Sequence, residues 1–236
     1  MRGTRDPASP AVAGAPAAVH EHSQAREASR RVFFALWPDA AQRAGLAHAI
    51  RKPVRSCGGR PVPPENLHVT LAFLGSVPER RVPELHRIAF GLAETFPATA
   101  EPLSLRFDRL VHWKRPQILC ALAGAAAMAD EDSAGEGSRT ENPERAEPSA
   151  PSSAARLATL LKEKTSAAGF TPDLKPFRPH VTLARKVVHA PTRCELSAVQ
   201  WDFDAFALIE SRTESAGPVY SVIESYLLGK REKAHE

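Results

Sequence analysis

The stretch HVTLA occurs twice in the chain, at residues 68–72 and again at residues 180–184. Each copy has the β-branched and apolar composition of a short strand. Each also follows a segment that carries prolines, residues 63–67 before the first copy and residues 175–179 before the second. The repeat indicates two equivalent strands, contributed by distant parts of the chain.

The spacing within each copy separates a polar face from an apolar one. Side chains two residues apart project to the same side of an extended strand, so His68 lies beside Thr70 and His180 beside Thr182. The opposite face carries the apolar residues of the two copies, namely Val69, Leu71, Val181 and Leu183. Two such strands would place four polar groups around one cleft while their other faces pack into a core.

Two histidines and two hydroxyls suit the opening of a cyclic phosphodiester. An imidazole titrates near 6.5 and can take or give a proton close to neutral pH. Threonine hydroxyls can donate hydrogen bonds to the phosphate oxygens. A single His-x-Thr usually marks only a half-exposed strand edge, so the duplication is what favours catalysis. A zinc site is disfavoured, because such sites want three or four ligands and neither motif places a carboxylate or cysteine beside its histidine. We therefore expect no metal and no cofactor.

Arg185 directly follows the second copy and can leave the strand end toward the same phosphate. From the sequence alone, a solvated strand-end charge explains it equally well. His112 and His189 are further histidines of the chain, but no pattern around either of them supports a role.

Two low-complexity stretches divide the chain. Residues 1–30 are rich in Ala, Pro, Ser and Arg, which predicts a disordered tail. Residues 124–155 lack periodic apolar residues and carry seven acidic side chains against two arginines, which predicts a disordered insertion. We expect one domain at 31–229, interrupted at about 125–154 and followed by a tail at 230–236. Since the whole chain has a net charge of +4, the folded part is more basic, which favours an anionic ligand such as RNA.

The cysteines Cys57, Cys120 and Cys194 are isolated, so neither a metal knuckle nor a disulfide framework is indicated. This usage fits the reducing cytoplasm, which is where we expect the protein. No apolar run approaches the roughly 18 residues that span a bilayer, so no membrane association is expected.

The periodicity predicts strands at 32–37, 66–74, 103–112, 117–123, 180–184, 203–210 and 219–228, and helices at about 39–51, 79–95 and 154–168. Strands and helices mix without regular βαβ spacing, which favours an α+β fold over a doubly wound sheet.

Longer matches around the motifs carry a family resemblance. RVFFALWP at 31–38, PPENLHVTLAFLG at 63–75 and PFRPHVTLAR at 176–185 resemble the two-histidine phosphoesterase superfamily, which a pair of His-x-Thr-x motifs defines. Within it, these stretches resemble specifically the bacterial RNA 2′,3′-cyclic phosphodiesterase branch, also described as 2′-5′ RNA ligase-like. LIES at 208–211 with Tyr220 resembles the last hairpin of that family, so the resemblance spans about residues 31–229.

The resemblance implies a bilobal fold with two antiparallel sheets around a central cleft, helices outside and pseudo-twofold symmetry. His68 would be the proton donor and His180 the proton acceptor, while Thr70, Thr182 and Arg185 would bind the phosphate. The reaction implied is hydrolysis of 2′,3′-cyclic phosphate at RNA 3′ ends to a 2′-phosphate, and we expect a monomer. Ligation to a 2′-5′ bond, hydrolysis of a small cyclic phosphate metabolite and non-catalytic binding of RNA ends stay open, because the motifs recognise little beyond the phosphate.

Overall fold

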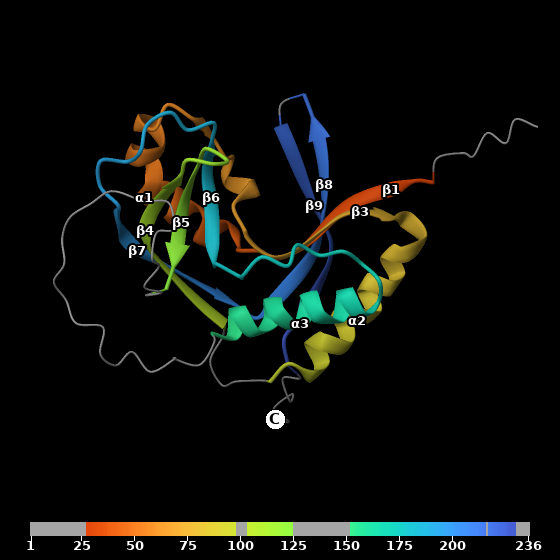
Figure 1. The fold of residues 1–236 in the computed structure, drawn as a ribbon. Helices are drawn as coiled ribbons and strands as arrows, with labels where there is room; N and C mark the ends of the chain where they lie inside the picture. The colour runs from red at the N-terminus through yellow and green to blue at the C-terminus, as the bar shows by residue number, and fades with distance from the viewer. Residues whose placement is uncertain (1–26, 98–102, 125–151, 216, 230–236) are drawn as a thin grey trace, which may run out of the picture.

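The computed structural model describes residues 27–97, 103–124, 152–215 and 217–229 (Figure 1). Most of the predicted N-terminal tail, most of the predicted acidic insertion and the C-terminal residues 230–236 lie outside the described residues. The strands are β1 (Ser29–Leu36), β2 (Arg60–Pro61), β3 (Val69–Pro78), β4 (Leu103–Trp113), β5 (Ile118–Ala123), β6 (His180–Arg185), β7 (Glu195–Phe203), β8 (Ala205–Glu214) and β9 (Gly217–Leu227). The helices are α1 (Ala40–Ser56), α2 (Val82–Thr95) and α3 (Ser153–Ala167), with short 3₁₀ turns η1 (Pro64–Asn66) and η2 (Glu79–Arg81).

The strands form one antiparallel array in the order β7-β4-β5-β6-β3-β1-β8-β9, and β2 pairs with β6 beside this path. The array consists of two four-stranded halves, because β3 and β6 pair at a single register position, Val69 opposite Val181. The expected pair of antiparallel sheets is therefore present as two halves joined at one point. Each half contributes its motif strand to the junction, as the predicted pseudo-twofold arrangement requires.

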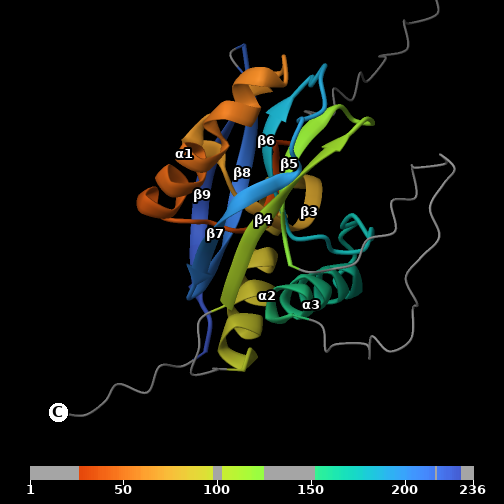
Figure 2. The same cartoon turned by 90° about the vertical axis from the view of Figure 1, so that its left-hand side faces the viewer.

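The two halves differ in where their strands come from along the chain. One half uses β4 to β7, which follow each other in sequence. The other uses β1 and β3 from the beginning of the fold and β8 and β9 from its end. In Figure 1 these two sets lie on opposite sides of the molecule, and Figure 2 shows β8 and β9 running past the first set. The α+β class is confirmed.

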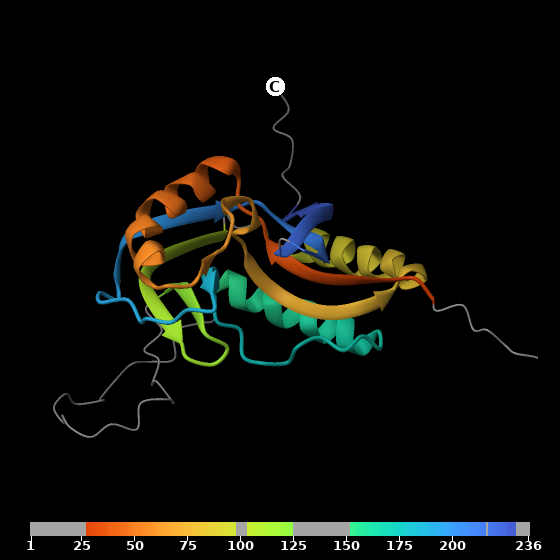
Figure 3. The same ribbon diagram turned by 90° about the horizontal axis from the view of Figure 1, so that it is seen from above.

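Helices cover the outer side of each half. Helix α1 packs against β7, while α3 packs on β3 and α2 packs on both α3 and β9. Seen from above in Figure 3, α1 lies over one half, and α2 and α3 lie beside the other. The start of α1 is fixed by a capping box, in which Asp39 Oδ1 accepts from the Gln42 amide at 2.7 Å and Gln42 Oε1 accepts from the Asp39 amide at 3.0 Å. Trp201 Nε1 donates to the Gln42 carbonyl at 2.9 Å and so ties the helix to β7.

Several boundaries differ from the sequence-based expectation. Strand β7 was not predicted, although its apolar residues Leu196, Trp201 and Phe203 are buried. The strand expected from residue 66 begins at Val69, because residues 64–66 turn into η1 first. Helix α1 continues to Ser56 with Pro53 inside it, beyond the predicted end at residue 51. At the domain edges, β1 begins at Ser29 and α3 begins at Ser153, so the folded residues extend slightly past both expected limits.

The apolar positions of the two motifs lie in the core, as predicted. Val69 and Val181 are fully buried, while Leu71 and Leu183 keep exposed fractions of 2% and 1%. These side chains belong to the main hydrophobic cluster, which includes residues of all three helices. The strand alternation therefore separates side chains that stabilise the fold from side chains that face the cleft.

We predict that Leu183→Ala lowers the free energy of unfolding by about 2 to 5 kcal/mol, because it leaves a cavity beneath the second motif. Val188→Ala is a matched control, since that side chain is 66% exposed a few residues later. Urea unfolding of both variants measures the difference. Equal stability of the two variants would show that the apolar face of the motif strand is not a packing face.

Candidate active site

The junction of β3 and β6 brings both motifs to one cleft of about 170 Å³. His68 lies immediately before β3 and His180 begins β6, and both line the cleft together with Thr70, Thr182 and Arg185. All five residues singled out from the sequence are thus neighbours in space. The cleft is completed by residues that the sequence analysis did not assign to the site, namely Arg31, Phe33, Phe73, Ser211 and Tyr220. The sequence held a signal for two of these residues. Arg31 and Phe33 are two positions apart on a strand, so they share one face, and that strand pairs with the first motif strand.

The two imidazoles are held by the same local contact. Nδ1 of His68 lies 2.7 Å from the Asn66 carbonyl oxygen, and Nδ1 of His180 lies 2.7 Å from the Arg178 carbonyl oxygen. A carbonyl only accepts, so Nδ1 carries the proton in each ring. This leaves Nε2 of each histidine as the nitrogen that can exchange a proton with a ligand. The two copies of the motif therefore hold their histidines in the same tautomer, with the proton on Nδ1.

Aromatic rings surround the His68 imidazole. The rings of Phe33 and Tyr220 lie 5.0 and 5.1 Å from it between centroids, and Trp37 stacks on it at 5.6 Å with an interplanar angle of 27°. The guanidinium of Arg43 lies over the Trp37 ring, 4.7 Å from the ring centroid. The contacts fix the plane of the imidazole and remove most of the water around it.

This desolvation controls the protonation of His68. Burial lowers its pKa from 6.5 to about 4, because a charged imidazolium is costly among apolar rings. The hydrogen bond to the Asn66 carbonyl opposes the shift, whereas the nearby positive charges of His180, Arg185 and Arg43 add to it. In the free protein, His68 is therefore neutral at neutral pH.

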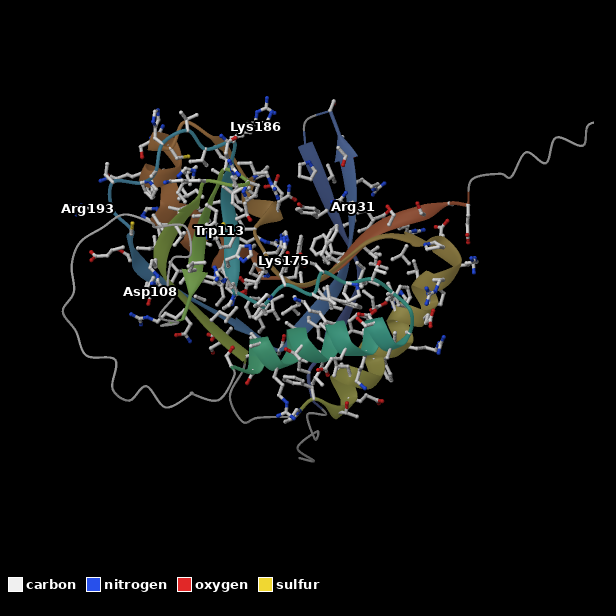
Figure 4. The ribbon with its side chains drawn as sticks, viewed as in Figure 1. Arg31, Asp108, Trp113, Lys175, Lys186 and Arg193 are labelled. Carbon is white, nitrogen blue, oxygen red and sulfur yellow. The ribbon has the colours of Figure 1, made fainter. Side chains whose placement is uncertain are left out.

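His180 has a simpler environment. The ring of Trp113 meets it edge to face at 4.8 Å. Burial also lowers the pKa of His180, and the hydrogen bond to the Arg178 carbonyl partly offsets this. In Figure 4, Trp113 lies by β5 and β6, whereas Arg31 lies across the cleft on the side of β1 and β8.

The hydroxyls and cations of the cleft suit an anion. Thr70 Oγ1 lies 3.2 Å from His68 Nε2, which places a hydroxyl beside the reactive nitrogen. Arg31 and Arg185 are exposed at the cleft, and Arg31 lies 4.8 Å above the Phe73 ring. No aspartate or glutamate of the described chain lines this cleft. The arrangement offers hydrogen-bond donors and positive charge without a competing carboxylate.

Cys120 is a cysteine next to the cleft, so its thiol has to be considered as a nucleophile. It lies opposite Thr182 in the pairing of β5 with β6 and is fully buried. Burial raises the pKa of its thiol to about 12, and the hydrogen bond with Thr182 offsets only part of the shift. Because a thiol rather than a thiolate is present at neutral pH, Cys120 is not a nucleophile here.

His112 and His189 do not line the cleft. His112 lines a separate hollow of about 640 Å³ beyond Trp113, and His189 is exposed in the loop after β6. In the described ranges, no three His, Cys, Asp or Glu side chains are grouped so that they could hold a metal ion. Metal independence stays a prediction. None of the described helices is long and apolar enough to cross a membrane.

A bilobal α+β fold that presents two His-x-Thr pairs to one cleft defines the class of two-histidine phosphoesterases. The model of the LigT like phosphoesterase family matches residues 36–120 and 146–220, and the chain belongs to this family.

Curated relatives and solved structures agree with this assignment. The RNA 2′,3′-cyclic phosphodiesterase of Thermus thermophilus is 31% identical over 203 residues, which cover 84% of this chain and 90% of that protein. The Escherichia coli protein of the same name is 28% identical over 163 residues, covering 69% and 76%. A crystal structure titled only as a phosphoesterase matches with a TM-score of 0.66 at 24% identity, over 86% of this chain and 100% of that one. E. coli LigT complexed with 3′-AMP matches with a TM-score of 0.63 at 24% identity and the same coverage.

We predict that both cleft imidazoles titrate below 6.5 in the free protein, with His68 near pH 4. Inorganic phosphate should raise both pKa values, because an anion stabilises the imidazolium form. Replacing Trp37 by alanine should move the pKa of His68 back toward 6.5, since water would then reach the ring. NMR titration of the histidine side chains measures each value. A free-state pKa of His68 above 6.5 would contradict the desolvation argument.

Proposed function

We propose that this chain hydrolyses the 2′,3′-cyclic phosphodiester at RNA 3′ ends and leaves a 2′-phosphomonoester. The observation that carries the proposal is the convergence of two identically anchored histidines, each with its threonine, on one cleft with exposed arginines. The names of the T. thermophilus and E. coli relatives support the substrate. The 3′-AMP complex of E. coli LigT supports a nucleotide ligand.

The phosphate is bound first. In the proposed complex, the non-bridging oxygens of the cyclic phosphate accept hydrogen bonds from Thr70 and Thr182, and Arg185 balances their negative charge. These contacts hold the phosphorus between the two Nε2 atoms, so that attacking and leaving oxygens can lie in line.

One proton transfer occurs on each side of the phosphorus. His180 Nε2 takes a proton from water as the water oxygen forms a bond to phosphorus. The bond from phosphorus to O3′ breaks, and His68 Nε2 donates a proton to the departing O3′. The phosphate remains on O2′. The next turnover requires the proton to return from His180 to His68, which solvent can mediate.

The proposed mechanism requires that the bound substrate change the protonation state of His68. His68 is neutral in the free protein, whereas the proposed donor must be an imidazolium. The negative phosphate beside Nε2 raises the pKa of His68 and so charges the donor when the substrate binds. A lowered pKa of His68 before binding also fits exchanged roles, in which His68 is the base and His180 the acid. The two assignments differ in which histidine becomes less important when the leaving group needs no proton.

2′-5′ ligation stays open as a second activity, because an RNA 5′-hydroxyl in place of the attacking water would join two strands through the same two proton transfers.

We propose that the protein acts as a monomer. We also propose that it works in the cytoplasm, where the free thiols Cys57, Cys120 and Cys194 would stay reduced.

We predict that His68→Ala and His180→Ala each reduce hydrolysis of a 2′,3′-cyclic phosphate oligonucleotide by about 10² to 10⁴-fold, with every assay run in EDTA. The double variant should lose much less than the product of the two effects, because the residues act as one unit. His189→Ala is the control and should resemble the wild type. If EDTA abolishes wild-type activity and a divalent metal restores it, the side-chain mechanism is wrong.

We predict that a catechol cyclic phosphate distinguishes the acid from the base. Its phenolic leaving group has a pKa of about 10 and departs without full protonation, unlike a ribose hydroxyl. His68→Ala should therefore lose about tenfold or less on this substrate, while His180→Ala should keep its loss of about 10² to 10⁴-fold. Steady-state rates on both substrates measure the contrast. Rescue of His180→Ala instead would assign the donor role to His180.

A further inference from the structure

A second hollow, of about 220 Å³, adjoins the phosphate cleft on the side of His68. It shares four residues with that cleft, namely His68, Thr182, Arg185 and Tyr220. Its walls are the segment from β2 to η1 and the β8–β9 hairpin. Asn66 Nδ2 donates to the Pro218 carbonyl at 3.0 Å and links the two walls. The hollow is therefore a continuation of the candidate active site.

In-line geometry indicates what this hollow holds, on the basis of the proposed function. The attacking water and the departing O3′ must lie on opposite sides of the phosphorus. Water is activated by His180, so O3′ and the ribose that carries it lie toward the donor His68. The nucleoside must therefore extend from the phosphate cleft into the space beside His68, and this hollow is the space that borders it.

The lining suits the faces of a ribose and a base. Pro63 and Pro218 line the two walls with apolar side chains, and Tyr220 adds an aromatic ring next to His68. Stacking of a base on the Tyr220 ring tolerates every base, because each base has a π-face. The contacts would hold a nucleoside without selecting its sequence.

Two exposed cations stand at the rim of the hollow. Arg60 is placed by the pairing of β2 with β6, where it lies opposite Arg185, and Val62 N donates to the Leu183 carbonyl at 2.8 Å just beyond. Lys186 follows β6 directly and has a φ of 55°. Among the described residues, no carboxylate lines the hollow. The rim therefore offers two positive charges where the next phosphate of an RNA strand would emerge.

We propose that this hollow is a nucleotide subsite, in which the terminal nucleoside packs against Pro63, Pro218 and Tyr220 while Arg60 and Lys186 bind its 5′-phosphate. The subsite then adds recognition of the 5′-phosphate of the terminal nucleotide to the RNA substrate of the proposed function. A small cyclic phosphate without the second phosphate lacks the rim contacts.

A minimal pair of substrates tests the assignment: adenosine 2′,3′-cyclic phosphate with and without a 5′-phosphate. The wild type should show a kcat/KM about threefold to tenfold higher for the 5′-phosphorylated compound, the range that two exposed ion pairs supply. The preference should shrink as the salt concentration rises.

The variants Arg60→Gln and Lys186→Asn should each reduce the preference, and the double variant should abolish it while leaving hydrolysis of the unphosphorylated compound unchanged. Asparagine is chosen at position 186 because it tolerates a positive φ. Lys114→Asn is the matched control, since that exposed lysine borders the larger hollow beyond Trp113. It should keep the preference.

Two results overturn the subsite while leaving the proposed function intact. One is a wild type that hydrolyses both compounds with equal kcat/KM. The other is loss of the preference in Lys114→Asn but not in the double variant, which would route the strand through the larger hollow. A wild type that hydrolyses neither compound nor a longer cyclic phosphate RNA would instead refute the proposed function, and the subsite would fall with it.

Discussion

The pairing of Val69 with Val181 is the contact on which the rest of the structure depends. It is the single register position at which β3 and β6 meet, and it joins the two halves of the sheet beside both catalytic candidates. A strand that slips by one residue turns all its side chains to the other face, so this register is what sends His68 and His180 to one cleft. The buried partners Leu71 and Leu183 hold the register by packing under the helices. The same alternation that builds the core therefore builds the site.

Desolvation and charge act against each other in the cleft. The rings of Phe33, Trp37 and Tyr220 orient His68 and deprive it of water, which lowers its pKa to about 4. A buried imidazole of this kind takes up its proton when an anion arrives, so binding and protonation are linked. Electrostatic contacts also strengthen once water is excluded. In the proposed mechanism, the aromatic rings around His68 thus supply both the geometry of the proton transfer and its dependence on the substrate.

The cations around the cleft come from separate parts of the chain. Arg31 stands on β1, Arg60 on β2, Arg185 at the end of β6 and Lys186 just after it. Among the described residues, no acidic side chain lines the phosphate cleft or the hollow of about 220 Å³ beside it. The local potential is therefore more positive than the net charge of +4 indicates. Sequence-independent attraction of a phosphate backbone follows from such a field. Composition indicated an anionic ligand, and the fold determines where on the surface that ligand is attracted.

The sequence by itself determined the motif strands, the polar faces that pair His68 with Thr70 and His180 with Thr182, the burial of the apolar faces and the α+β class, because strand alternation and helix capping are local properties. It also predicted the start of α1, where Asp39 and Gln42 close a capping box. Only the tertiary structure decided that β8 and β9 join β1 and β3, that Trp37 and Tyr220 meet His68, and that Arg60 stands beside Arg185. It also revealed the edge strand β7, which was not predicted although Val199, Trp201 and Phe203 alternate with polar residues along it. These features depend on strand pairings between residues far apart in the sequence, and no local pattern encodes which strands become neighbours.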